Sequence, residues 1–256
     1  MLILYGRYPF HRVENTLFRI PDAGTEMLKI DDPMFEGTVI KRENRFLVSV
    51  RMNGREVYAH LHDPGRLREL IYPGASVLLR KTKGEKTSYS ITAGFSGDET
   101  ILVDTRFHNK IGEKFIVKPT GSEVNHGDSR FDFSVDGGFV EIKGCTMGIQ
   151  DYVIFPDAPS LRGAKHLLEL SQLKERGKKA GVIFLLFRKN ASFFYPNRIT
   201  DQKFASAFFT AHSSGVEMLF PKFAWEDGKI IFRGLAILGK DPVDILEKIR
   251  ENLSKK

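Results

Sequence analysis

The stretch that decides the fold is SRFDFSVDGGFVEIKG, residues 129–144. Two apolar runs flank the turn residues Asp136-Gly137-Gly138, and this pattern predicts a β-hairpin. Residues two apart in a strand point the same way, so Glu141 and Lys143 share one face. Asp132, on the neighbouring strand, can bring its carboxylate to that face. The hairpin therefore carries two acids and a lysine where a strand usually carries hydrophobic residues.

These three polar side chains point to chemistry on phosphate esters. Two converging carboxylates suit a hard divalent cation that prefers oxygen ligands, such as Mg²⁺ or Mn²⁺. A lysine beside them can hold an attacking water or stabilise charge that develops on a phosphate. The spacing alone is short and common, and by itself it favours an exposed Glu–Lys pair on the wet face of a hairpin. The opposite face is expected to pack into a core through Phe131, Phe133, Val140 and Ile142.

The segments around the hairpin predict an α/β domain. Residues 160–177 form the clearest helix, with Ser160 as N-cap and Gly177 at its end. The apolar run at 179–188 is typical of a buried strand. Further elements are a helix at 105–116, a strand at 122–127, a helix at 201–215, a hairpin at 218–238 and a helix at 241–256. The order helix, three strands, helix, strand puts the polar residues in adjacent strands, and this context favours the catalytic interpretation.

Before this domain the pattern changes to short strands. Two alternating runs within residues 35–61 are separated by Asn53-Gly54, a strong hairpin signal. Residues 63–70, DPGRLREL, predict a short helix with Asp63 as N-cap. Further short strands are expected between residues 73 and 105. Many short strands joined by Gly-rich turns predict a small barrel.

The chain has 256 residues and a net charge of +7, and most of this charge lies in the barrel segment. Between residues 41 and 90 there are eleven Lys and Arg and five Asp and Glu, a difference of +6. Such a segment favours nucleic acid as a partner, although a mildly basic, solvated surface is the competing interpretation. Phe46 is expected in the core. We expect phosphate contacts from the pairs Arg42/Arg45 and Arg66/Arg68.

A second charged cluster lies at the start of the helix at 160–177. Arg162, Lys165, His166 and Glu169 are three and four residues apart, so they share one helix face. Arg162 and Lys165, with the free N–H groups of the first turn, can hold a phosphate. The competing interpretation is a capped, solvated face with a Lys165–Glu169 pair, and for His166 we expect a position on the polar surface.

The cysteine count and the lengths of the apolar runs exclude several classes of protein. The single cysteine, Cys145, excludes an internal disulfide and a four-cysteine zinc site. The longest apolar run, residues 182–187, is far shorter than the ~20 residues of a membrane-spanning helix. The N-terminal residues do not have the pattern of a signal peptide. We expect a soluble, cytoplasmic protein without a membrane partner; its oligomeric state stays open, and a dimer is one option.

Residues 35–239 resemble the sugar fermentation stimulation protein family. The resemblance rests on several long motifs: KRENRFLVSV (41–50), AHLHDPGRLRELIYPGASV (59–77), VDTRFHNKI (103–111), SRFDFSV (129–135), VEIKG (140–144), FPDAPSLRGAKHLLEL (155–170) and SSGVE (213–217). It implies an α+β protein, with a small OB-like β-barrel followed by an α/β domain of the PD-(D/E)XK nuclease fold, whose central mixed sheet is flanked by helices. It also implies DNA binding without marked sequence preference and a role in regulating sugar use.

The resemblance also implies a site. Carried onto this chain, the nuclease motif falls on Asp132, Glu141 and Lys143, and Glu123 on the preceding strand is a further acidic candidate. Asp132, Glu141 and Glu123 would then hold Mg²⁺ or Mn²⁺. The expected boundaries are an N-terminal extension at 1–33, the DNA-binding barrel at 34–100, the nuclease-like domain at 101–240 and a C-terminal helix at 241–256.

Two functions stay open at this point. One is a DNA-binding protein whose metal site hydrolyses phosphodiesters, and the other is a non-catalytic DNA-binding regulator of sugar (maltose) metabolism. The fold does not choose between them, because one fold hosts many functions. The first predicts DNA cleavage that depends on Asp132 and Lys143. The second predicts binding that weakens steeply with salt and leaves the DNA intact.

Overall fold

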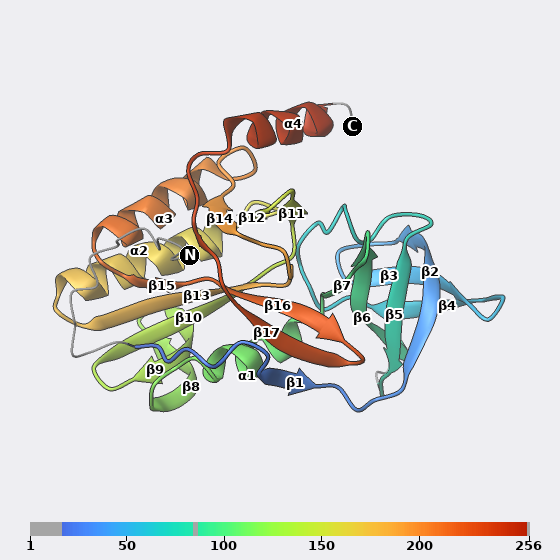
Figure 1. The fold of residues 1–256 in the computed structure, drawn as a ribbon, viewed down its shortest axis with the longest axis horizontal. Helices are drawn as coiled ribbons and strands as arrows, with labels where there is room; N and C mark the ends of the chain where they lie inside the picture. The colour runs from blue at the N-terminus through green and yellow to red at the C-terminus, as the bar shows by residue number, and fades with distance from the viewer. Residues whose placement is uncertain (1–16, 84–86, 255–256) are drawn as a thin grey trace, which may run out of the picture.

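Two β-sheets and the helices that pack on one of them make up most of the fold (Figure 1). The computed structural model describes residues 17–83 and 87–254 of the chain. One sheet forms the barrel on the right of Figure 1, and the other is the mixed sheet on the left. The expected α+β architecture, with an OB-like barrel before a sheet flanked by helices, is confirmed.

The barrel is closed by five strands. Its strand order is β4-β3-β2-β5-β6, and a pairing between β4 and β6 completes the ring, with β7 added beside β6. Asn53 and Gly54 form the two-residue turn between β3 and β4, both with positive φ, as the hairpin signal predicts. The strands are β2 (Met34–Arg42), β3 (Leu47–Met52), β4 (Arg55–His60), β5 (Ser76–Lys81), β6 (Tyr89–Ser96) and β7 (Glu99–Leu102).

The mixed sheet is built around β13 (Lys179–Leu186), the buried strand expected from the apolar run. It pairs in parallel with β10 and β16, and also with the short β15. The order across the sheet is β1-β17-β16-β13-β10-β9-β8. The remaining strands are β1 (Glu26–Lys29), β8 (Pro119–His126), β9 (Ser129–Val135), β10 (Gly138–Cys145), β15 (Glu217–Leu219), β16 (Pro221–Glu226) and β17 (Lys229–Leu235).

Two layers cover the mixed sheet, one on each face. Helices α2 (Leu161–Glu175) and α3 (Gln202–Ser213) pack on one face, while α1 (His108–Glu113) and the barrel lie against the other (Figure 1). Strand β13 packs against both layers. Val182 and Phe184 belong to the helix-side core. Ile183 and Leu185, which alternate with them, join the core shared with the barrel.

A smaller sheet extends the helix-side layer. It comprises β11 (Gly148–Ile149), β12 (Tyr152–Phe155), β14 (Phe193–Pro196) and β18 (Ile237–Leu238). The last helix, α4 (Val243–Ser254), packs on this region through Ile245, Leu246 and Ile249. The α4 helix is amphipathic, and its apolar side is the one that is buried.

Two local predictions in the barrel are wrong. Residues 63–70 do not form a helix: the chain turns there, and Leu67 has a positive φ of 46°. The backbone N–H of Leu67 is held by Asp157 Oδ2, at 2.8 Å, which lies in the second domain and replaces a helical hydrogen bond. Phe46 is not in the core, since 42% of it is exposed and its ring stacks on His60.

Part of the N-terminal segment belongs to the second domain. Strand β1 pairs antiparallel with β17 at the edge of the mixed sheet. Leu17 is buried in the core, and its backbone N–H donates to Glu217 at 2.9 Å. Of the extension expected at 1–33, residues 17–33 are therefore ordered by the sheet, and residues 1–16 lie outside the described residues.

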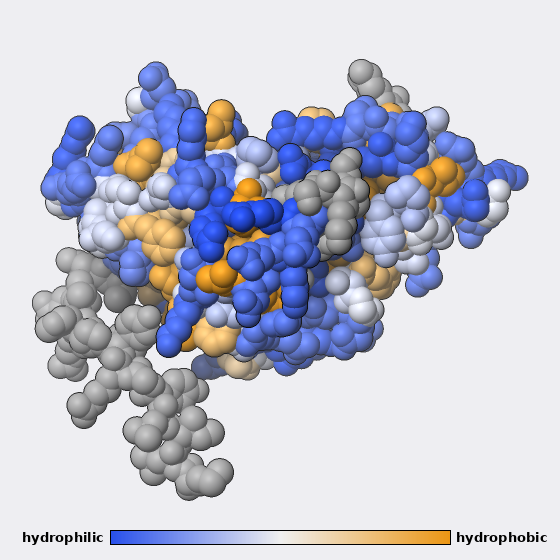
Figure 2. Space-filling view, turned by 90° about the horizontal axis from the view of Figure 1, so that it is seen from above, coloured by the Kyte–Doolittle hydropathy of each residue, from blue (hydrophilic) through white to orange (hydrophobic). Residues whose placement is uncertain are grey.

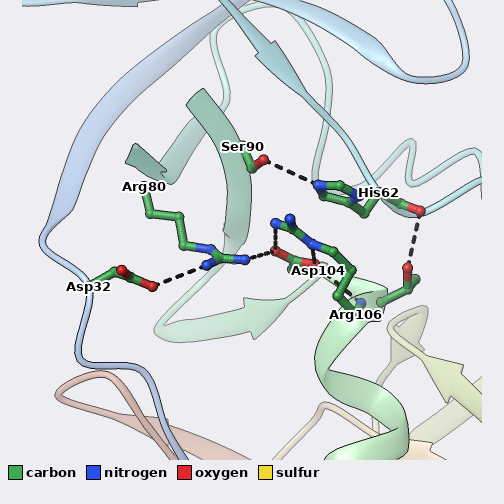
Figure 3. Close-up of polar contacts among 7 residues, drawn as sticks. Asp32, His62, Arg80, Ser90, Asp104 and Arg106 are labelled. Carbon is green, nitrogen blue, oxygen red and sulfur yellow. Dashed lines mark hydrogen bonds and ion pairs between the residues drawn. The ribbon is translucent and has the colours of Figure 1, made fainter. Parts of the chain in front are cut away.

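A buried carboxylate joins the barrel to the second domain (Figure 3). Asp104 has no exposed surface, and its Oδ2 accepts from Arg80 Nη2 at 2.9 Å and from Arg106 Nη2 at 2.7 Å. Arg80, on β5, also reaches Asp32 at 3.1 Å. Burial opposes the charge of Asp104, but the two arginines outweigh it and lower the pKa of this carboxyl. The network ties the N-terminal segment, the barrel and the start of the second domain to one another.

The hydropathy of the surface and of the helices can be described directly. Figure 2 shows a mostly hydrophilic face on which exposed hydrophobic residues occur in small groups. Among the described residues, no helix is long and apolar enough to cross a membrane.

Candidate functional site

The β9–β10 hairpin forms as its sequence predicts, but its pairing changes at the acidic residues. Val140 pairs with Phe133, and the next backbone hydrogen bond is replaced by a side chain: Asp132 Oδ2 accepts from the N–H of Ile142 at 2.7 Å. This contact places the carboxylate of Asp132 against β10. The expectation of one common apolar face is wrong for Phe131, which packs into the helix-side core, whereas Phe133 joins the core shared with the barrel.

Glu141 is the centre of the polar cluster. It is only 4% exposed, and its Oε1 accepts from Lys143 Nζ and, at 2.6 Å, from Nδ1 of His166. Burial opposes ionisation, but Lys143 and His166 outweigh it and lower the pKa of Glu141 to about 2. Glu141 is therefore charged at neutral pH, and Lys143 shares its face as the alternation predicts.

The pKa of Asp132 shifts in the opposite direction to that of Glu141. Burial raises its pKa, and the neighbouring negative charge of Glu141 raises it further, to about 6. The hydrogen bonds from Ile142 and Asn109 act against this rise. Two carboxylates that repel one another in a buried site are the arrangement that a divalent cation stabilises.

Asn109, at the start of α1, was not indicated by the sequence pattern. Its Nδ2 donates to Asp132 Oδ1 at 3.2 Å and to Glu123 Oε1 at 2.9 Å. Glu123 is exposed, has a positive φ of 54°, and also pairs with Arg130 at 2.5 Å. Glu123 thus connects to the site through an amide. The motif VDTRFHNKI contains Asn109, but nothing in its spacing shows that α1 packs beside β9.

One oxygen of the cluster is left without a partner. Oε2 of Glu141 is buried and accepts no hydrogen bond from any described residue. A buried carboxylate oxygen without a partner calls for an explanation, and it can still accept a hydrogen bond or coordinate a cation. Within residues 17–83 and 87–254, no group of three or more His, Cys, Asp or Glu side chains is arranged to hold a metal ion. Asp132 and Glu141 nevertheless fit Mg²⁺, which is usually held by one or two carboxylates and completes its shell with water and substrate phosphate.

Helix α2 brings its first turns to the edge of this cluster. Ser160 caps the helix as predicted, accepting from the N–H of Gly163 at 3.2 Å. His166 is 2% exposed and donates to Glu141, so the expectation that it lies on the polar surface is wrong. Arg162 donates from Nε to His166 Nε2 at 3.4 Å, and Lys165 lies 3.6 Å from Glu169. Arg162 and Lys165 are exposed, and Arg162 reaches Glu141 only through the ring of His166.

The four barrel arginines occupy different environments. Arg66 and Arg68 are exposed on the loop after β4, and Arg45 lies over the ring of Phe46, with Nε donating to the carbonyl of Pro64 at 3.1 Å. Arg42 is instead committed to the loop itself, because its guanidinium donates to the carbonyls of residues 44, 45, 65 and 66. Contact with phosphate stays a prediction for these residues, and Arg42 has the fewest donors to offer.

Two domain models of one protein family match consecutive parts of the chain. Residues 40–103 match the SfsA N-terminal OB domain, and residues 102–229 match the sugar fermentation stimulation protein RE domain. Together the two matches cover most strands of both sheets and all residues of the candidate site. The chain belongs to the sugar fermentation stimulation protein family. This confirms the resemblance found in the sequence motifs.

Individual members of the sugar fermentation stimulation family match this chain over most of its length and most of their own. A sugar fermentation stimulation protein homolog of Saccharolobus solfataricus is 44% identical over 211 residues, which cover 82% of this chain and 88% of the relative. A homolog of Thermoplasma volcanium is 46% identical over 194 residues, covering 76% and 89%. Among solved structures, Pyrococcus furiosus SfsA in complex with Ca²⁺ has a TM-score of 0.77 and 29% identity, and covers 84% of this chain and 100% of its own.

Proposed function

We propose that this protein binds DNA without marked sequence preference and hydrolyses its phosphodiester bonds with the help of Mg²⁺ or Mn²⁺. The observation that carries the proposal is the buried Oε2 of Glu141, which has no partner among the described residues and lies next to Asp132, on the same strand as Lys143. Similarity to a structure of Pyrococcus furiosus SfsA in complex with Ca²⁺ supports a site for a divalent cation.

Asp132 and Glu141 would hold the cation. When bound, it would supply positive charge to the scissile phosphate and lower the pKa of a bound water. Asn109 holds Asp132 in place, and His166 holds Glu141. These two contacts fix the orientation of both carboxylates before any substrate arrives.

Lys143 provides the remaining charge of the site. Its side chain is 15% exposed, and it shares Oε1 of Glu141 with His166. An ammonium group in this position can orient an attacking water and stabilise the negative charge of the transition state. Because Lys143 keeps two further N–H donors beyond its bond to Glu141, it can perform this role without leaving the carboxylate.

DNA would be held by the basic surface of the barrel. Arg66 and Arg68 are exposed there, and Arg45 is exposed beside the ring of Phe46. Charge of this kind follows the sugar–phosphate backbone, while exposed rings stack on bases. The affinity is therefore expected to fall steeply with salt and to vary little with sequence.

A cleavage assay tests the proposal. Purified protein is incubated with single- and double-stranded DNA in Mg²⁺ or Mn²⁺, and the products are separated on a gel. We expect cleavage, and a loss of about 100-fold or more in Asp132→Ala and Lys143→Ala, with DNA binding retained. If DNA of both forms stays intact with both metals, catalysis on DNA is excluded.

The second candidate is a non-catalytic DNA-binding regulator of sugar metabolism. It is favoured by the observation that the described residues provide only two carboxylates at the cluster centre, with Oε1 of Glu141 already occupied. This function predicts intact DNA and binding that Arg66→Ala or Arg68→Ala weakens equally on different sequences. A salt titration by fluorescence anisotropy, with a gel for DNA integrity, distinguishes it from the nuclease.

A further inference from the structure

A basic pocket lies beside the carboxylates, on the far side of His166. Its wall comes from the turn between β8 and β9 and from the first turns of α2. Three cationic side chains line it, Arg130, Arg162 and Lys165, against one carboxylate, Asp128. We call it the Arg162 pocket. Its charge suits an anion, whereas the neighbouring pair of carboxylates suits a cation.

Several donors in the Arg162 pocket are free to bind a ligand. Nε of Arg162 donates to His166, but the other guanidinium N–H groups of Arg162 have no hydrogen-bond partner among the described residues. Ser129 also lines the pocket; it is 6% exposed, and its buried Oγ has no partner in the described part of the chain. A buried hydroxyl without a partner calls for an explanation, and a ligand oxygen within reach of its rotating O–H supplies one.

The backbone of α2 reinforces the same preference. The helix has 15 residues and begins at Leu161, and Leu161 and Arg162 of its first turn line the pocket, so the positive end of the helix lies beside it. Arg130 forms an ion pair with Glu123 at 2.5 Å, and Lys165 forms one with Glu169 at 3.6 Å. Arg162 forms no ion pair with a carboxylate of the described residues, so it is the cation most available to a ligand. A phosphate matches this set, because a guanidinium binds two of its oxygens in a fixed geometry.

The pocket is coupled to the candidate catalytic carboxylate through one ring. His166 donates from Nδ1 to Glu141 and accepts at Nε2 from Arg162, so a single imidazole separates the two sites. We propose that the Arg162 pocket binds a phosphate group of the nucleic-acid strand, next to the phosphate that lies at Asp132 and Glu141. This inference rests on the proposed function and adds to it a position that fixes the strand relative to the cleaved bond.

The phosphate has two sources, and the test separates them. An internal phosphodiester would make the pocket a general strand-holding site, whereas a terminal monoester, which carries more charge at neutral pH, would direct the site to strand ends. The probes are three forms of one short single strand with a fluorophore on an internal base. One form has no terminal phosphate, one has a 5′-phosphate and one has a 3′-phosphate.

Binding is measured by fluorescence anisotropy in Ca²⁺, and the strand is checked on a gel afterwards. Arg162→Gln removes the free cation, and Lys203→Gln, on α3 and also exposed, removes the same charge outside the pocket. We expect Arg162→Gln to weaken binding about tenfold and Lys203→Gln about twofold or less. A loss limited to one phosphorylated form identifies a terminal phosphate, and an equal loss on all three identifies an internal one.

Different results would contradict the Arg162 pocket and the proposed function. If wild type binds the strands and the two variants lose the same small amount, the Arg162 pocket is not a phosphate site, and the proposed function is untouched. If wild type binds none of the strands, the nucleic-acid function fails and the pocket inference fails with it.

Discussion

The two oxygens of Glu141 differ in every respect that matters for the site. Oε1 is saturated by Lys143 and His166, whereas Oε2 is buried and has no partner among the described residues. A carboxylate held this firmly keeps its charge at neutral pH, since its pKa lies at about 2. The free oxygen then presents a fixed negative charge to whatever lies between Glu141 and Asp132.

His166 is expected to act through Glu141 as a positioning residue. His166→Ala removes the 2.6 Å contact to Oε1 and frees the carboxylate to rotate. Loss of such a supporting partner costs about 10- to 100-fold in metal affinity. Titration calorimetry with Mn²⁺ measures the change, and His212→Ala, an exposed histidine on α3, is the control. Equal affinities for both variants would show that His166 has no such role.

A second histidine makes stability depend on pH. His108 is buried against Phe187, and burial lowers its pKa to about 4 from an unfolded value of 6.5. The folded state therefore resists protonation, and stability is lost as pH falls from about 6.5 to about 4, by up to about 3 kcal/mol. Asp132, with a pKa raised to about 6, acts in the opposite sense over part of this range.

The pH effect is isolated by comparing slopes. Urea unfolding of wild type and of His108→Leu is measured at several pH values between 6.5 and 4. We expect the free energy of unfolding of the wild type to fall more steeply with acidification than that of the variant, whatever their difference at neutral pH. Parallel curves would mean that His108 is not the group responsible.

At the scale of elements, two adjacent glycines close the hairpin for different reasons. Gly137 needs its positive φ of 78°, and a Cβ there meets no atom within 4 Å. A Cβ on Gly138 would lie 1.7 Å from the carbonyl oxygen of Lys179, on the neighbouring strand β13. Gly137→Ala is expected to cost about 1 kcal/mol in backbone strain. Gly138→Ala is expected to cost about 2 kcal/mol more, because β10 and β13 must separate. Denaturant unfolding of both variants tests the order, and equal costs would be contrary to it.

The polar network at the domain junction is another element with a measurable role. Asp104→Asn leaves Arg80, whose side chain is 13% exposed, without the nearest of its two carboxylates. Breaking a buried pair in this way costs about 3 kcal/mol or more. Asp98→Asn is the control, since that residue is 82% exposed in its pair with Lys189 and should cost about 0.5 kcal/mol or less. Comparable urea midpoints for the two variants would refute the assigned role of Asp104.

The elements that sequence predicts well are those decided by local pattern. The turn at Asn53-Gly54, the capped helix α2 and the hairpin β9–β10 all follow from spacing and turn residues. The wrong helix at residues 63–70 shows the limit, because the N–H of Leu67 finds its partner 90 positions away, at Asp157. The sequence does not indicate Asn109 for the same reason, because its amide contacts Asp132 only once α1 has packed beside β9. A contact between segments that are far apart in the chain leaves no periodic pattern or fixed spacing in the sequence, so it cannot be predicted from local pattern.

At the scale of the whole molecule, the barrel and the second domain share one core. The same hydrophobic cluster contains Val50 and Leu79 of the barrel and Phe133 and Ile142 of the hairpin. Polar contacts add to it, since Glu99 accepts from Arg188 at 3.4 Å and from the N–H of residue 189 at 2.8 Å. The basic barrel is thereby fixed relative to the carboxylates, and under the proposed function a nucleic-acid strand bound to the barrel would meet them in a constant orientation.

The most direct test of this account is the position of a divalent cation. Crystals of the protein soaked in Mn²⁺ are measured at the manganese absorption edge, and an anomalous difference map locates the ion. We predict a peak that contacts Oε2 of Glu141 and the carboxylate of Asp132, and that disappears in Glu141→Gln. A map without a peak at these oxygens, at saturating Mn²⁺, would contradict the central claim that they form a metal site.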